Sequence, residues 1–108
     1  MTTTPKVARF MTMTAKPGRG QDLATAMLAV AESLRSTSGC EIYLISREQS
    51  NADLIHITEL WTDKETAEAA LTASTAHRPG VPSIADVMTL LTEPPGRIDL
   101  VPLGGIGA

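Results

Sequence analysis

Two kinds of hydrophobic spacing follow one another along this chain. A period of two predicts strands, and apolar residues recurring every three or four positions predict helices. The predicted strands are Val7–Ala15, Cys40–Arg47, Leu54–Trp61 and Ile98–Leu103. Three helices are predicted. The first has Asp22 in its first turn and ends before Gly39, the second runs from Thr62 or Asp63 to about Ala73, and the third covers Ser83–Leu91.

This order of elements predicts an α+β fold with a ferredoxin-like split βαβ arrangement and an antiparallel sheet. The connection between the second and third strands is short, which favours antiparallel pairing. Helices are then expected on one face of the sheet only. The strand Leu54–Trp61 carries apolar residues on both faces, so its open face needs a cover. We therefore expect a homodimer that buries this face.

Size and composition narrow the class of protein. The chain of 108 residues fits a single domain (1–108), with a core at about 7–103, a flexible N-terminus and a glycine-rich C-terminal tail. A formal net charge of −3 argues against a nucleic-acid partner. No segment has the ~18 apolar residues that cross a bilayer, and no apolar signal core opens the sequence. Together with the lone Cys40, which excludes an internal disulfide, this predicts a cytoplasmic protein without membrane contact.

The third predicted strand carries the first candidate site residues. Alternation places Ile57, Glu59 and Trp61 on one face. Trp61 is either a core anchor or a wall on which an aromatic ligand stacks. Glu59 either pairs with Arg9 or Arg47, or acts as a general base whose pKa is raised by burial.

The loop of residues 74–82 carries the second candidate, His77. It is either an exposed loop residue or a general base, since imidazole titrates nearest to neutral pH. His56 lies on the opposite face of its strand and is expected to be structural or interfacial. Cys40 is expected to be a small buried hydrophobe. Neither metal-ligand spacing nor a phosphate-binding loop is present, so no metal or cofactor is expected.

Three segments are informative through their order and spacing. They are the Lys16-Pro17-Gly18 break before a helix, the Gly39-Cys40-x-x-Tyr43 start of a strand, and Ile57-Thr58-Glu59-Leu60-Trp61 before a polar helix cap. Together these segments resemble the antibiotic biosynthesis monooxygenase domain. The resemblance extends from about Val7 to Leu103. It implies a dimeric α+β barrel, whose enzymatic members oxidise phenols or quinols to quinones with molecular oxygen and without metal, flavin or haem.

The resemblance also implies site residues. Trp61 matches the tryptophan at the end of the family's strand, Glu59 a frequent acidic residue, Tyr43 a common aromatic, and His77 the histidine of the loop after the second helix. Ile57 lies near the place of an asparagine that catalytic members carry. Haem-degrading members carry an asparagine on the first strand, and its absence here argues against haem degradation.

The resemblance therefore implies a cofactor-independent monooxygenase that binds a small aromatic molecule and molecular oxygen. The expected catalytic residues are His77, Trp61 and Glu59, and the expected substrate-binding residues are Tyr43, Ile57, Phe10 and Met11. Two alternatives stay open: a non-catalytic, stress-related barrel that binds small molecules, and a cyclase of aromatic polyketides.

Overall fold

The computed structural model describes residues 5–76 and 78–107. It contains a four-stranded sheet and three helices. In chain order the elements are β1 (Val7–Thr14), α1 (Gly20–Ser33), β2 (Cys40–Glu48), β3 (Asn51–Trp61), α2 (Lys64–Ala73), α3 (Ile84–Met88) and β4 (Gly96–Leu100). The predicted α+β, ferredoxin-like arrangement is confirmed.

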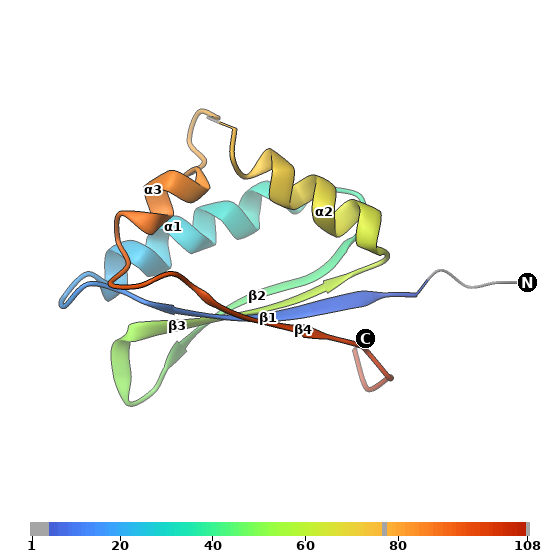
Figure 1. Cartoon of the computed structure of the whole chain (residues 1–108), viewed down its shortest axis with the longest axis horizontal. Helices are drawn as coiled ribbons and strands as arrows, with labels where there is room; N and C mark the ends of the chain where they lie inside the picture. Colours follow the sequence, from blue (N-terminus) through green and yellow to red (C-terminus); the bar gives the residue numbers. More distant parts are fainter. Residues whose placement is uncertain (1–4, 77, 108) are drawn as a thin grey trace, which may run out of the picture.

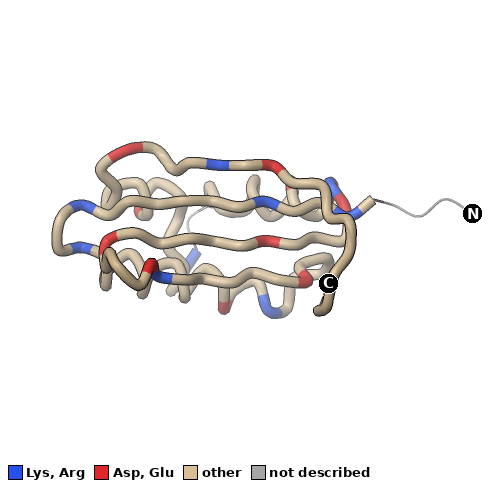
Figure 2. Tube along the Cα trace, turned by 90° about the horizontal axis from the view of Figure 1, so that it is seen from below, with Lys and Arg blue, Asp and Glu red and all other residues tan. Residues whose placement is uncertain are grey.

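The sheet has the strand order β2-β3-β1-β4, and all three pairings are antiparallel. All three helices lie on one face of it (Figure 1). Figure 2 looks onto the opposite face, where the four strands lie in front of the helices and no other described element covers them. The sheet therefore has a helix-facing side and an open side within one chain.

The core fills the space between the sheet and the helices. Met13, Ile55 and Ile57 contribute from the strands, and Leu23 and Met27 contribute from α1. Because neighbouring residues of a strand point to opposite faces, the odd-numbered positions of β1 and β3 form this side. Burial of these side chains holds α1 against the sheet.

One end of the core is held by Asp53. Its carboxylate accepts backbone N–H bonds from Gly18 at 3.1 Å and Gly20 at 2.9 Å, which ties the start of α1 to β3. A Cβ atom at Gly20 would lie 2.0 Å from the carbonyl oxygen of Ala52, so only glycine fits there.

The starts of α2 and α3 carry side-chain caps. Asp63 accepts a hydrogen bond from the Thr66 N–H at 2.8 Å, as expected for the N-cap of α2. Ser83 and Asp86 form a capping box at α3.

The boundaries of several elements differ from the predictions. β3 begins at Asn51 rather than Leu54, since Gln49 and Ser50 alone form the turn of the hairpin. The helix predicted for Ser83–Leu91 is only Ile84–Met88, and β4 is Gly96–Leu100 rather than Ile98–Leu103. Within residues 5–76 and 78–107, no helix is long and apolar enough to span a membrane.

Candidate functional site

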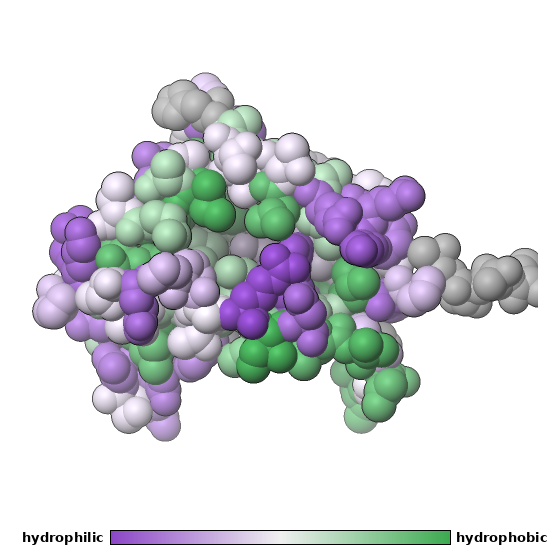
Figure 3. Space-filling view, viewed as in Figure 1, coloured by the Kyte–Doolittle hydropathy of each residue, from purple (hydrophilic) through white to green (hydrophobic). Residues whose placement is uncertain are grey.

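A cavity of about 110 Å³ lies between the sheet and the helices. Strands β1, β2, β3 and β4, all three helices and the loop before α3 contribute to its lining. Figure 3 shows it as a hollow between the helical layer and β4, with strongly hydrophilic residues on its lower rim. The apolar part of the lining consists mainly of aliphatic and methionine side chains, namely Met11, Met13, Met27, Val30, Leu34, Leu71, Ile84 and Val87.

The polar part of the lining is centred on a single row across the sheet. Tyr43 of β2 pairs with Glu59 of β3, and Glu59 pairs with Arg9 of β1. Residues opposite one another in a sheet project to the same face. The register therefore brings three polar side chains together on the helix-facing side.

Glu59 binds two donors through one of its oxygens. Arg9 Nη2 donates to Glu59 Oε1 at 3.1 Å, and the indole N–H of Trp61 donates to the same oxygen at 3.0 Å. Arg9 Nη2 also donates to the carbonyl oxygen of Ala67 at 3.4 Å. Among the described residues the second carboxylate oxygen, Oε2, accepts no hydrogen bond. Glu59 is thus an oriented carboxylate that keeps one oxygen without a donor in the lining of the cavity.

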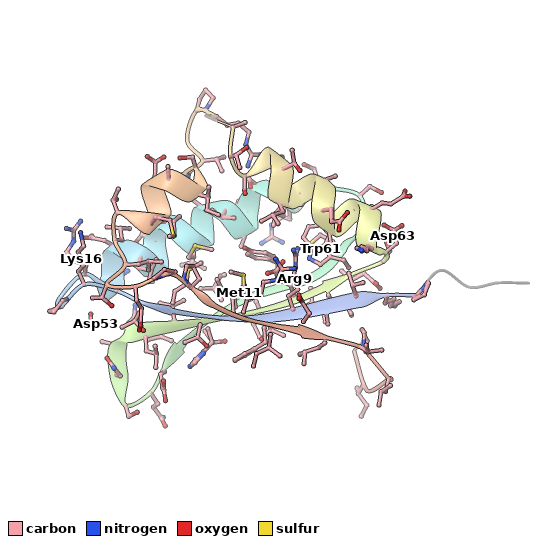
Figure 4. All side chains as sticks on the ribbon, viewed as in Figure 1. Arg9, Met11, Lys16, Asp53, Trp61 and Asp63 are labelled. Carbon is pink, nitrogen blue, oxygen red and sulfur yellow. The ribbon has the colours of Figure 1, made fainter. Side chains whose placement is uncertain are left out.

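The pairing of Arg9 with Glu59 is buried. The side chains of Arg9 and Glu59 are only 8% and 4% exposed. The guanidinium carbon of Arg9 also lies 5.9 Å from the centre of the Trp61 ring, within cation–π range. Figure 4 shows Arg9, Met11 and Trp61 on the helix-facing side of the sheet. Of the two partners that the sequence offered for Glu59, the structure selects Arg9; Arg47 instead donates to Gln21 at 2.9 Å.

The environment of Tyr43 keeps its phenol protonated. Burial first, and then the negative charge of Glu59, raise the pKa of Tyr43 well above its ordinary value. Its hydroxyl makes no hydrogen bond with any described residue. Tyr43 therefore offers a neutral hydroxyl to the site. Burial and Glu59 also raise the pKa of the nearby Cys40 thiol, which keeps it protonated.

A tight turn positions the loop that precedes α3. The carbonyl oxygen of Arg78 accepts the N–H of Val81 at 3.2 Å, and Gly80 has a φ of +73°. Proline at the second position and a glycine with positive φ at the third are typical of a type II turn. Arg78 occupies the first position of this turn and lines the cavity.

The structure brings together most of the residues predicted from the sequence. Trp61, Glu59, Tyr43 and Met11 line the cavity. Ile57 lies on the same face, fully buried in the core beneath it.

Phe10 and His77 are the other two residues that the sequence predicts for the site. Phe10 is not part of the lining, because it follows Arg9 on β1 and so points to the open face, where its ring stacks on His56 at 5.3 Å. His77 lies outside the described residues.

Sequence reasoning missed two basic residues of the lining, Arg78 and Arg97. The Arg-Pro-Gly-Val turn was a usable local signal for Arg78. No local sequence signal marked Arg97, because its position depends on the pairing of β4 with β1. Among the described residues, no cluster of three His, Cys, Asp or Glu side chains could hold a metal ion.

The comparison with protein families decides the membership of this chain. The family model of the antibiotic biosynthesis monooxygenases (ABM) matches residues 7–79. The chain belongs to the antibiotic biosynthesis monooxygenase family. No curated protein matches the sequence. The ABM match covers β1 to α2 and the loop up to Pro79, which includes Arg9, Tyr43, Glu59 and Trp61.

Solved structures of similar fold come from several bacteria. PA3566 of Pseudomonas aeruginosa has a TM-score of 0.74 at 18% identity, with 96% of this chain and 100% of that chain covered. Rv0793 of Mycobacterium tuberculosis has a TM-score of 0.76 at 19% identity, covering 94% and 98%. A variant of SnoaB, a cofactor-independent oxygenase from Streptomyces nogalater, has a TM-score of 0.75 at 16% identity, covering 94% and 97%. At these identities the likeness shows the fold alone.

Proposed function

We propose that this ABM-family chain is a cofactor-independent monooxygenase that oxidises a phenolic or quinol aromatic to a quinone with molecular oxygen. The observation that carries the proposal is the apolar cavity with Trp61, Tyr43 and the oriented Glu59 carboxylate in its lining. A site of this kind buries a ring and fixes its polar substituents with a few convergent groups. SnoaB, one of the proteins with a similar structure, is a cofactor-independent oxygenase.

The size of the cavity bears on the substrate. An apolar cavity of ~150 Å³ can hold one benzene molecule, so a cavity of about 110 Å³ has room for no more than one aromatic ring. A larger polycyclic substrate would place one ring inside and extend through the mouth. Trp61 would form a wall, and Met11 would contact the ring from β1.

The proposed reaction needs a group that removes a proton. A phenolate passes an electron to oxygen far more readily than the neutral phenol does. We assign this role to His77. Ser74, three positions before it, and Arg78, directly after it, both line the cavity. Imidazole is matched to this task near neutral pH. Tyr43 would donate its hydroxyl proton to an oxygen of the substrate.

Glu59 has a different part in this proposal. Its Oε1 is engaged by Arg9 and Trp61, which orients the Trp61 ring and neutralises the Arg9 charge. Its Oε2 is the alternative proton acceptor if His77 is not the base. The same engagement of Glu59 favours the second candidate function, a barrel that binds an aromatic ligand without turning it over.

We further propose that the working form is a homodimer assembled through the open face. One row across this face consists of Leu44, Thr58, Phe10 and Ile98. The side chains of Leu44 and Ile98 are more than half exposed in the single chain. A second copy would remove this apolar surface from water.

Oxygen uptake tests the proposed reaction. Purified protein would be mixed with hydroxylated naphthalenes and anthracenes in chelator-treated buffer, with an oxygen electrode and quinone absorbance as readouts. We expect oxygen consumption and quinone formation above the uncatalysed rate for at least one quinol. Binding of these compounds without any increase in rate would support the non-catalytic alternative.

A further inference from the structure

The cavity carries more positive than negative charge. Three guanidinium groups line it, from Arg9, Arg78 and Arg97, and the carboxylate of Glu59 is the only acidic side chain among the described residues of its lining. Arg9 is neutralised by Glu59 at 3.1 Å. Arg97 donates to Asp99 at 2.9 Å, and its side chain is 44% exposed, so it is partly neutralised on the side that meets solvent.

Of the three arginines in the lining, Arg78 is the one that the described residues leave without a counter-charge. Among the described residues it forms no ion pair, and its side chain makes no hydrogen bond. Its Nε atom, like that of Arg9, is shielded from solvent and has no acceptor among the described residues. Leaving a charged donor buried without an acceptor costs free energy, and an anionic ligand would remove that cost.

The backbone around Arg78 holds it in place before any ligand arrives. The type II turn fixes Arg78 relative to Val81, and the N–H of Ile84 donates to the carbonyl oxygen of Ser74 at 2.9 Å, which closes the base of the loop. A preformed turn lowers the ordering cost of binding. A guanidinium group also matches a carboxylate in geometry, because two parallel N–H bonds can reach its two oxygens.

We infer that the cavity selects an aromatic ligand that carries a carboxylate, and that Arg78 binds this carboxylate with Arg97 contributing positive charge at the same cavity. The ring lies against the apolar lining, and the carboxylate meets the guanidinium group that none of the described residues neutralises. The inference rests on the proposed function in taking this cavity as the ligand site. It deepens that function by naming the substrate class, aromatic acids with a phenolic or quinol ring.

Binding measured without oxygen tests this inference separately from any reaction. Under nitrogen, calorimetry would compare 1,4-dihydroxy-2-naphthoate with 1,4-dihydroxy-2-naphthamide, which differ in one charge at nearly the same shape. We expect the carboxylate to bind about 10- to 100-fold more tightly, the range for a charge-assisted hydrogen bond. Equal affinities, or no binding of the carboxylate, would overturn the inference without any variant being needed.

Variants then assign the effect to a residue. Arg78→Gln should raise the Kd of the carboxylate about 10-fold or more and leave that of the amide unchanged, and Arg78→Lys should restore part of the preference. The control is Arg19→Gln, which removes an equal charge from an exposed pair with Asp22 and should change neither Kd. An equal loss for both ligands in Arg78→Gln, or the same loss in Arg19→Gln, would reject Arg78 as the carboxylate site.

The oxygen electrode separates the two proposals. If the carboxylate binds more tightly but no oxygen is consumed, the carboxylate site stands and the oxidation is rejected. If oxygen is consumed with both ligands at equal affinity, the oxidation stands and the carboxylate site is rejected.

Discussion

The indole N–H of Trp61 donates a hydrogen bond of 3.0 Å to Glu59, which lies two residues earlier on the same strand. Alternate residues of a strand share a face, so this short sequence separation places both side chains on the helix-facing side. The bond holds the Trp61 ring beside the cavity and gives a buried carboxylate one of its two donors. Glu59 and Trp61 therefore form a buried hydrogen-bonded pair and also line the proposed ligand site.

The first prediction concerns the buried pair of Glu59 and Arg9. Glu59→Gln should lower the free energy of unfolding by about 3–5 kcal/mol, because it leaves the Arg9 charge buried without a counter-charge. Urea denaturation followed by circular dichroism would measure this. The double variant Glu59→Gln, Arg9→Met should lose clearly less than the sum of the two single variants. Additive losses would mean that the two side chains are not energetically coupled.

The second prediction concerns Trp61, which is 1% exposed. Trp61→Ala should destabilise the fold by about 3–5 kcal/mol through the cavity it leaves. Trp61→Phe keeps most of the ring and should cost about 2 kcal/mol, chiefly from the lost hydrogen bond to a charged acceptor. Chemical denaturation monitored by circular dichroism distinguishes them. Equal costs for the two variants would show that the hydrogen bond, and not the packing, is what matters.

The third prediction uses the single tyrosine of the chain. Burial and Glu59 raise the pKa of Tyr43, so the folded protein holds this proton when the unfolded chain, with an ordinary pKa of about 10, has released it. The stabilising contribution is therefore full below pH 10 and is lost as the pH rises above it. Absorbance of the phenolate at 295 nm should stay absent in the folded protein well above pH 10.

Tyr43→Phe provides the control for that titration. Its free energy of unfolding should fall less between pH 9 and pH 11 than that of the unchanged protein, since other alkaline groups titrate equally in both. A phenolate midpoint near pH 10 in the folded protein would contradict the raised pKa.

The fourth prediction concerns the open face. Leu44→Glu or Ile98→Glu should convert the proposed dimer to a monomer, because a charge would have to be buried in an apolar contact. Sedimentation velocity at micromolar concentration would measure the mass. Leu28→Glu is the matched control, since Leu28 is exposed to the same degree as Leu44 but lies on α1. A monomer mass for the unchanged protein would reject this interface.

The fifth prediction concerns the proposed base. If the chain is an oxygenase, His77→Ala should lower turnover by ~10²–10⁴-fold, the usual contribution of a general base. Its circular dichroism spectrum should not change. Thr75→Ala, in the same loop with an exposed side chain, should keep full activity. Unchanged quinone formation by His77→Ala would move the role to Glu59 Oε2 or to solvent.

The spacing of apolar residues was enough to predict the order of elements and the ferredoxin-like class. It also placed Ile57, Glu59 and Trp61 on one face, because alternation is a local property of a strand. The N-cap of α2 was predictable as Thr62 or Asp63 for the same reason, since a cap depends on residues within one turn, and the structure shows Asp63 in that role. The family resemblance was readable from the order of three short segments between Lys16 and Trp61 and is confirmed by the family model.

Only the tertiary structure decided which of these residues meet. Alternation repeats every two positions, so it allows many registers that differ by two residues. The register that pairs Glu59 with both Tyr43 and Arg9 comes from the packing of three strands. The same packing placed Met11 in the cavity and Phe10 on the open face, although the sequence predicts both as substrate-binding residues. Arg78 joined the site because a turn and the closure of its loop brought it over the sheet, and such long-range contacts depend on the whole fold rather than on local spacing.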